Sequence, residues 1–215
     1  QVLDETLLQE NHPYARTPEM QLSHFGRLTE NQPIFWENNF SYVFFQQSDA
    51  IIPSAHRLSW KSSFQAPFMA PWGLVEPKLE LNHRLYRLSD DADNNENVEF
   101  TIPTVSINNR LVFQKDINNK YLQTIEPRFF YTYTPFKDQS NVPLFDTSEL
   151  TLDYDQLFLS NPFIGGDRIA DRQQISLGLT SRLFDADNGR ILLQADIGQG
   201  FLFHRPETQD LNTSL

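Results

Sequence analysis

The chain has 215 residues, 39% of them hydrophobic and 13% aromatic, and a formal net charge of −11 at pH 7. This acidic balance argues against nucleic acid as a partner, because nucleic-acid binding needs clustered lysine and arginine to neutralise phosphates. No apolar run approaches the roughly 18 residues of a membrane-spanning helix, and the absence of cysteine excludes thiolate metal sites.

Apolar and polar residues alternate with a period of two along most of the chain, which is the pattern of a half-buried β-strand. In the stretch QQISLGLTSRLF, for example, Leu177 and Leu179 fall on one face while Thr180 and Arg182 fall on the other. One face of each strand is therefore apolar and the other is polar or charged. In chain order we expect eight strands, at residues 18–29, 35–47, 56–71, 74–88, 104–117, 121–136, 171–185 and 190–204.

The connections between these strands alternate in length. Short connections are expected at residues 30–34, 72–73, 118–120 and 186–189. Long polar connections are expected at residues 48–55, 89–103 and 137–170. Outer-membrane β-barrels sort their connections in this way, with short turns at the periplasmic rim and long loops at the extracellular rim. We therefore predict an all-β fold, an antiparallel transmembrane β-barrel fragment with meander topology that belongs to a larger outer-membrane barrel.

Two predicted strands contain a proline near their middle, in the tripeptides Glu76-Pro77-Lys78 and Glu126-Pro127-Arg128. Proline cannot donate a hydrogen bond to a strand ladder and is usually confined to edges, strand starts and bulges. Alternation places the glutamate and the base on the polar face and the proline on the apolar face. Two interpretations stay open: each proline marks a β-bulge, or each loosens the ladder and lets the wall flex.

Ionic side chains on the polar faces are candidates to line a water-filled lumen. They could balance one another as internal salt bridges or contact a hydrophilic headgroup, and the residues alone leave both roles open. The candidates are Glu76, Lys78, Arg84, Arg110, Glu126, Arg128, Arg182 and Asp196.

Residues 137–170 form the longest connection, called the inward segment below, and a loop of this length is usually functional or disordered. Its apolar side chains would be poorly placed in solvent, so we expect the segment to fold inward over the lumen. It would do so either as a self-packed cap or against a partner. These apolar residues are Leu144, Phe145, Leu157, Phe158, Phe163 and Ile164.

Catalytic motifs are missing from the sequence. It contains neither a Gly-x-Ser-x-Gly elbow nor a His-Glu-x-x-His metal helix, and its five histidines are scattered. Asp153 and Asp155 offer oxygen atoms of the kind that Ca²⁺ accepts, but Asp-x-Asp is too common to predict a site. We therefore expect no enzyme activity, no cofactor and no metal.

Four runs in the second half of the chain occur in the order and spacing of one known family. They are Glu126-Pro127-Arg128, Lys137-Asp138-Gln139-Ser140, Asp167-Arg168-Ile169 and Gly178-Leu179-Thr180-Ser181-Arg182. A looser match extends from PYARTPEMQLSHFG through PWGLVEPKLEL. Residues 12–205 thus resemble the central barrel of the LPS-assembly protein LptD (OstA/Imp) family.

This resemblance implies a large barrel in the bacterial outer membrane, among outer-membrane lipids, that inserts lipopolysaccharide into the outer leaflet through a lateral seam. It implies two partners: a plug lipoprotein, LptE, and a periplasmic Lpt bridge that is met by an N-terminal domain expected outside this chain. If the inward segment contacts the plug, the candidate residues are Asp138, Gln139, Phe145, Phe158, Phe163, Asp167 and Arg168.

Two other functions fit parts of the pattern. A general outer-membrane porin or substrate channel would have an open lumen and a steady ion conductance. A soluble β-sandwich that binds carbohydrate would pack its apolar face against a second sheet. The surroundings of four residues separate the sandwich from the barrel, namely Leu177, Leu179, Ile191 and Ile197.

Overall fold

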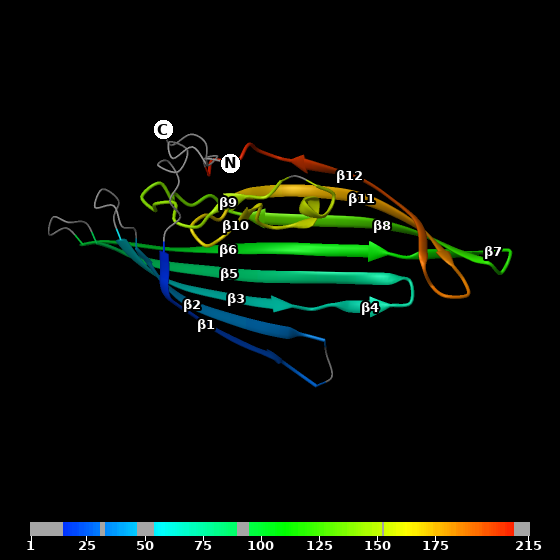
Figure 1. The fold of residues 1–215 in the computed structure, drawn as a ribbon, viewed down its shortest axis with the longest axis horizontal. Helices are drawn as coiled ribbons and strands as arrows, with labels where there is room; N and C mark the ends of the chain where they lie inside the picture. Colours follow the sequence, from blue (N-terminus) through cyan, green and yellow to red (C-terminus); the bar gives the residue numbers. More distant parts are fainter. Residues whose placement is uncertain (1–14, 31–32, 47–53, 90–94, 152, 209–215) are drawn as a thin grey trace, which may run out of the picture.

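The structure is a computed structural model that describes residues 15–30, 33–46, 54–89, 95–151 and 153–208. Its long strands form one antiparallel sheet in the order β1-β2-β3-β5-β6-β8-β11-β12, so each pairs with the next long strand along the chain (Figure 1). The bounds are β1 Ala15–Arg27, β2 Phe35–Gln46, β3 Ser54–Gln65, β5 Gly73–Ser89, β6 Asn95–Leu111, β8 Tyr121–Thr134, β11 Arg172–Asp185 and β12 Ile191–Leu202. The short strands β4 Phe68–Ala70 and β7 Phe113–Ile117 add to β5 and β8.

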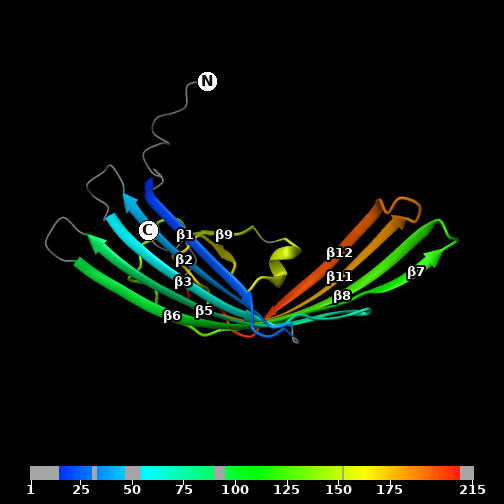
Figure 2. The same ribbon diagram turned by 90° about the horizontal axis from the view of Figure 1, so that it is seen from below.

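The sheet is a curved and open wall. Figure 2 shows the two wings of the arc with the inward segment on the concave side. Within the described residues, β1 and β12 are the two edges and do not pair with each other. Among the same residues, none forms a helix with the length and apolar character that a membrane span requires. The predicted all-β, meander-type barrel fragment is confirmed.

Some predicted boundaries are wrong. β6 begins at Asn95 and not at residue 104, and it pairs with β5 from the contact of Asn95 with Ser89 onward. The expected long connection at 89–103 is therefore mostly strand; its residues 90–94 and residues 48–53 of the connection expected at 48–55 lie outside the described residues. The single strand expected at 56–71 is divided into β3 and β4, with Pro67 in the gap between them.

Neither proline of the Glu-Pro-base tripeptides marks a bulge. The register runs without a shift through Pro77 opposite Ile107 and through Pro127 opposite Leu179. On the other side of β8 the ladder is interrupted between the pairs Arg110–Arg128 and Phe113–Ile125, where β6 gives way to β7. This gap faces Pro127, whose nitrogen has no hydrogen to donate. The bulge interpretation is therefore wrong, and flexing of the wall stays a prediction.

The two faces of the wall differ in chemistry as alternation predicts. Large apolar side chains are exposed on the convex face, including Leu177 (47%), Leu179 (41%) and Ile197 (71%), and Ile191 at the β12 edge is also 49% exposed. No second layer covers these four residues in the described structure. The concave face carries buried polar side chains instead, including Arg57, Ser59, Glu80, Asn82, Arg84, Thr132, Gln174, Ser176 and Thr180. The second sheet that a sandwich requires is therefore not present among the described residues.

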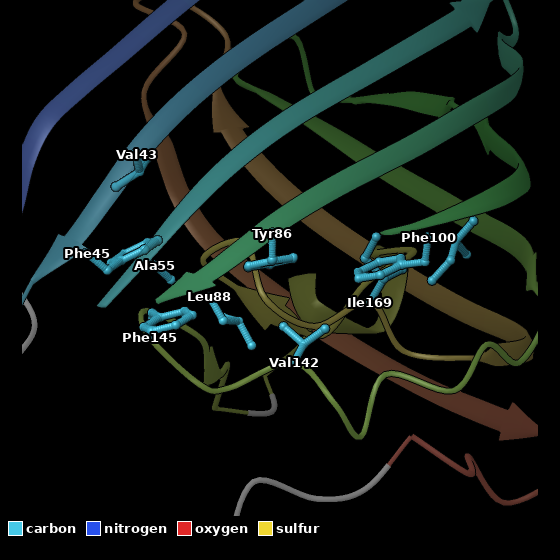
Figure 3. Packing of buried hydrophobic residues seen from close by; sticks show 10 residues of the cluster. Val43, Phe45, Ala55, Tyr86, Leu88, Phe100, Val142, Phe145 and Ile169 are labelled. Atoms are coloured by element: carbon cyan, nitrogen blue, oxygen red, sulfur yellow. The ribbon is translucent and has the colours of Figure 1, made fainter. Parts of the chain in front are cut away.

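Near the rim with the long connections, the concave face of β2, β3, β5 and β6 becomes apolar. Figure 3 shows side chains of β2, β3, β5 and β6 packed against the inward segment, and these form the buried core. Phe45 lies parallel to Phe145 with ring centres 4.6 Å apart, and Tyr86 stacks near Phe100 at 6.3 Å. The core consists of Val43, Phe45, Ala55, Tyr86, Leu88, Phe100, Ile102, Val142, Phe145 and Ile169.

Candidate lumen-facing site

The inward segment connects β8 to β11 and lies on the concave face of the wall (Figures 1 and 2). It contains β9 Ser148–Glu149, the 3-10 helix η2 Asp155–Phe158 and β10 Phe163–Ile164, and β9 pairs with β10. Phe145 and Phe158 are buried, which confirms the expected inward fold. Ile164 is 49% exposed, so its expected burial is wrong. Phe163 and Ile164 are successive residues of β10, so their side chains point to opposite faces. Phe163 points toward the wall, and Ile164 points away from it.

Arg57 of β3 is the main anchor of the segment. Its guanidinium donates two parallel hydrogen bonds to Asp146, Nη1 to Oδ1 and Nη2 to Oδ2, each 2.7 Å long. Nη1 also donates to Oδ1 of Asp167 at 2.8 Å. Arg57 is 5% exposed and Asp167 is fully buried. Because a bidentate arginine–carboxylate pair fixes orientation as well as distance, this contact positions the segment on the wall.

Asp167 collects further donors from the segment and the wall. Its Oδ2 accepts the backbone N–H groups of Phe145 and Asp146, both at 2.8 Å, and its Oδ1 accepts the hydroxyl of Tyr86 at 3.1 Å. A buried carboxylate is tolerated only when it is paired and hydrogen-bonded. Asp167 therefore joins β3, β5 and two parts of the segment through one side chain.

The two carboxylates of this network titrate differently. Burial raises the pKa of Asp167, and the neighbouring charge of Asp146 raises it further against the opposing charge of Arg57. Burial also acts to raise the pKa of Asp146, but the hydrogen bonds and the charge of Arg57 outweigh it and lower this pKa to about 2. Asp146 is consequently ionised at neutral pH and is a permanent partner of Arg57.

Hydrogen bonds from polar side chains join the two ends of the segment. Gln139 donates to the carbonyl of Ile169 at 2.8 Å and accepts the N–H of Ile169 at 3.0 Å, as a strand neighbour would. Asn161 accepts the N–H of Ala170 at 3.1 Å, and Arg168 donates to the carbonyl of Val142 at 2.6 Å. The segment is thus held to itself as well as to the wall.

A pair of glycines forms the surface on which η2 rests. Gly178 of β11 and Gly198 of β12 are direct cross-strand neighbours. A Cβ atom on Gly178 would lie 2.5 Å from Cζ of Phe158, and one on Gly198 would lie 2.7 Å from Cδ1 of Leu157. Because neither glycine carries a side chain, η2 can approach the two strands closely at these positions.

A polar cavity of about 310 Å³ next to η2 brings together most of the predicted lumen residues. Within it, Arg182 forms an ion pair with Glu126, and Asp196 accepts a hydrogen bond of 2.7 Å from Thr180. The guanidinium of Arg128 lies 3.9 Å from the centre of the Phe158 ring. The predicted residues that line this cavity are Arg110, Glu126, Arg128, Arg182 and Asp196.

A second polar cavity, of about 390 Å³, lies between the wall and residues 159–169 of the segment. Two predicted lumen residues, Lys78 and Arg84, line it. Arg168, which we expected to contact a plug, lines it as well. Glu76 lines neither of these two cavities. Among the described residues, no group of three or more histidine, aspartate or glutamate side chains is arranged to hold a metal ion.

Comparison with known proteins shows the family of this chain. The family model LptD, LPS transport system D, matches residues 1–214. The chain belongs to the LptD family. The LPS-assembly protein LptD of Hahella chejuensis is 32% identical over 215 residues, which cover 94% of this chain and 26% of that protein. The LPS-assembly protein LptD of Alcanivorax borkumensis is 35% identical, with 94% of this chain and 27% of that protein covered.

This LptD chain spans about a quarter of the length of the curated relatives it matches. The LPS-assembly protein LptD of Ralstonia nicotianae, for example, is 33% identical over 87% of this chain but only 24% of its own length. The chain therefore corresponds to one part of an LptD protein, namely a stretch of wall and the inward segment attached to it.

The residues predicted to contact a plug divide into two groups in this LptD wall. Gln139, Phe145, Phe158 and Asp167 are buried in contacts within the chain. Asp138 is exposed, and Phe163 and Arg168 are partly exposed. The first group holds the segment in place, whereas the second group keeps all or part of its side-chain surface exposed.

Three members of the anchoring network were not among the predicted site residues: Arg57, Tyr86 and Asp146. Alternation does put Arg57 on the polar face, but its partners lie 89 and 110 residues away in sequence. Tyr86 continues the polar face of β5, which also carries Arg84. Periodicity indicates the face of each residue and gives no information about which residue meets it across the lumen.

Proposed function

We propose that this chain is part of an outer-membrane translocon that transports lipopolysaccharide and assembles it into the outer leaflet. The observation that carries the proposal is the division of the wall into an exposed apolar convex face and a polar concave face. In a membrane, the convex face would contact hydrocarbon and the concave face would enclose water. Membership of the LptD family, whose curated relatives are named LPS-assembly proteins, supports lipopolysaccharide as the cargo.

The two polar cavities support a hydrophilic path along the inside of the wall. Their linings combine arginine, lysine, carboxylate, hydroxyl and amide groups, which suit the sugars and ionic groups of a headgroup. The acyl chains of the cargo would stay with the apolar convex face and the bilayer. The rim that carries the inward segment would be extracellular, and the rim with the short turns would be periplasmic.

Site-specific photo-crosslinking tests this function in the full-length protein. A photoreactive residue at Arg110 or Gln194, on the concave face, should form adducts with labelled lipopolysaccharide during export. The matched position Leu193 on the convex face should give adducts with membrane lipids instead. Absence of lipopolysaccharide adducts from every concave position, together with a steady ion conductance in planar bilayers, would contradict the proposal and support a general channel.

The inward segment would contact an LptE-like plug lipoprotein, and an N-terminal domain outside this chain would receive lipopolysaccharide from the periplasmic Lpt bridge. Support for the plug contact comes from Asp138, whose side chain is exposed, and from Phe163 and Arg168, which are partly exposed although both also line the cavity against the wall. A photoreactive residue at Asp138 should crosslink to the plug, whereas one at the exposed turn residue Asp187 should not. Equal crosslinking at both positions, or none at Asp138, would contradict this contact.

A further inference from the structure

The cavity beneath residues 159–169 has a lining whose positive charge exceeds its negative charge. Four basic side chains border it, from Lys61, Lys78, Arg84 and Arg168. Among its lining residues, Glu80 is the single acidic one. The cavity of about 310 Å³ beside η2 differs, because three arginines there face four carboxylates. The positive excess is thus a local property of one cavity and not of the whole concave face.

The charge of this cavity is not cancelled by contacts within the chain. Glu80 forms ion pairs with both lysines, Lys61 and Lys78. Arg84 donates to the carbonyl oxygens of Gly166 and His83, each at 3.1 Å. Arg168 likewise donates only to carbonyls, those of residues 167 and 142, at 3.2 and 2.6 Å. Neither guanidinium group forms an ion pair among the described residues, and the charge of Asp167 acts on both of them only from a greater distance.

The burial of Arg84 makes this arrangement informative. Arg84 is 9% exposed, and an arginine so enclosed is normally paired with a carboxylate or another anion. The carboxylates of Asp146 and Asp167 lie in the neighbouring network, where Arg57 binds both of them. Both carboxylates attract Arg84 from that network without contacting it. The wall thus holds a buried cation at the edge of a cavity with no anion in direct contact, and a ligand would supply that contact.

We propose that this cavity binds a saccharide that carries an anionic oxygen group, either a phosphate or a carboxylate. Arginine and lysine form charge-assisted hydrogen bonds with such oxygens. Ser160, Asn161 and Thr104 add hydroxyl and amide groups that suit sugar hydroxyls. A volume of about 390 Å³ falls in the range of small-molecule sites, which begins at about 300 Å³. The identity of the natural ligand rests on the proposed function, whereas the binding itself does not.

Calorimetric titration of the purified full-length protein tests the site directly. The probes are glucose 6-phosphate, inorganic phosphate and, as the uncharged control, glucose. Glucose 6-phosphate should bind, and K78Q and R168Q should each weaken it about tenfold, since each removes one charge-assisted hydrogen bond. K115Q changes an exposed lysine of β7 outside the cavity and should bind as the native protein does. Heat-dependent electrophoretic mobility checks that each variant keeps a folded barrel.

A competition arm identifies the source of the anion. Displacement of glucose 6-phosphate by lipopolysaccharide, but not by its dephosphorylated form, would support a glycolipid headgroup as the ligand. Displacement by neither form would support a free sugar phosphate. The site is overturned if no phosphate probe binds, or if K78Q, R168Q and K115Q bind equally well. Lipopolysaccharide crosslinking elsewhere on the concave face would then still stand, so failure of this site and failure of the proposed function are distinguishable.

Discussion

Replacing Asp167 with alanine should release the inward segment from the wall. The carboxylate is fully buried and accepts hydrogen bonds from Arg57, Tyr86 and the backbone of residues 145 and 146. Arg57 keeps its pair with Asp146 in this variant, but the buried N–H groups of residues 145 and 146 lose their acceptor, and Arg57 and Tyr86 each lose one hydrogen bond. Each buried donor left without an acceptor costs about 1–3 kcal/mol, so the total should be about 3 kcal/mol or more. Each 1.4 kcal/mol is a factor of ten, so the open population of the segment should rise at least about a hundredfold.

Limited proteolysis of the full-length protein measures this change, because cleavage of a transiently opened segment follows its open population when reclosing is fast. The rate of cleavage within residues 137–170 should rise with D167A while the remaining wall stays resistant. D187A removes an exposed aspartate in the turn between β11 and β12 and should leave the rate unchanged. Equal cleavage of D167A and the native protein would refute the view that this network holds the segment.

Three further changes should have distinct effects. G178A places a Cβ atom 2.5 Å from the Phe158 ring, so it should displace η2 at a cost of about 1–3 kcal/mol and increase cleavage near residues 153–155; unchanged cleavage there would contradict the glycine surface. L177K places a charge on the convex face and should cost about 2–4 kcal/mol in a bilayer, so heat-resistant barrel should be lost, whereas Q194K on the concave face should be tolerated. Acidification should weaken docking of the segment mainly between pH 3.8 and about 2: the pKa of Asp146 is lowered by folding, so its stabilisation is complete above the unfolded value and is lost as pH falls toward the folded one. The raised pKa of Asp167 acts with the opposite sign, so the native protein is compared with D146N in pepsin cleavage across this range; the same pH profile for both proteins would contradict the role of Asp146.

Alternation was sufficient to predict the main strands and their two faces, since successive residues of a strand point to opposite faces and the two faces of this wall differ in polarity. It failed at residues 95–103 for a physical reason. There Phe100 and Ile102 turn inward to the core beneath the inward segment, while Glu99 and Thr101 turn outward. The apolar face is reversed relative to the rest of the wall, and an acidic stretch with this reversal resembles a polar loop.

The candidate site was predictable only in part. Residues such as Arg128 and Arg182 could be assigned to the concave face, because each follows the polar positions of a regular strand. Their grouping into one cavity depends on η2, which brings Tyr154 and Asp155 against β8 and β11. The anchoring network depends on contacts between residues about a hundred positions apart, and no local pattern in the sequence indicates such contacts.

The account depends most directly on which face of the wall meets hydrocarbon. Single fluorescent amino acids can be placed genetically along β11 of this stretch in the reconstituted full-length protein. Labels at Leu177 and Leu179 should be quenched by lipid-borne quenchers, and labels at the concave-face positions Arg182 and, on neighbouring β12, Gln194 by water-soluble ones. Quenching by lipid at both sets of positions, or at neither, would contradict a wall with an apolar outer face and a wet inner one.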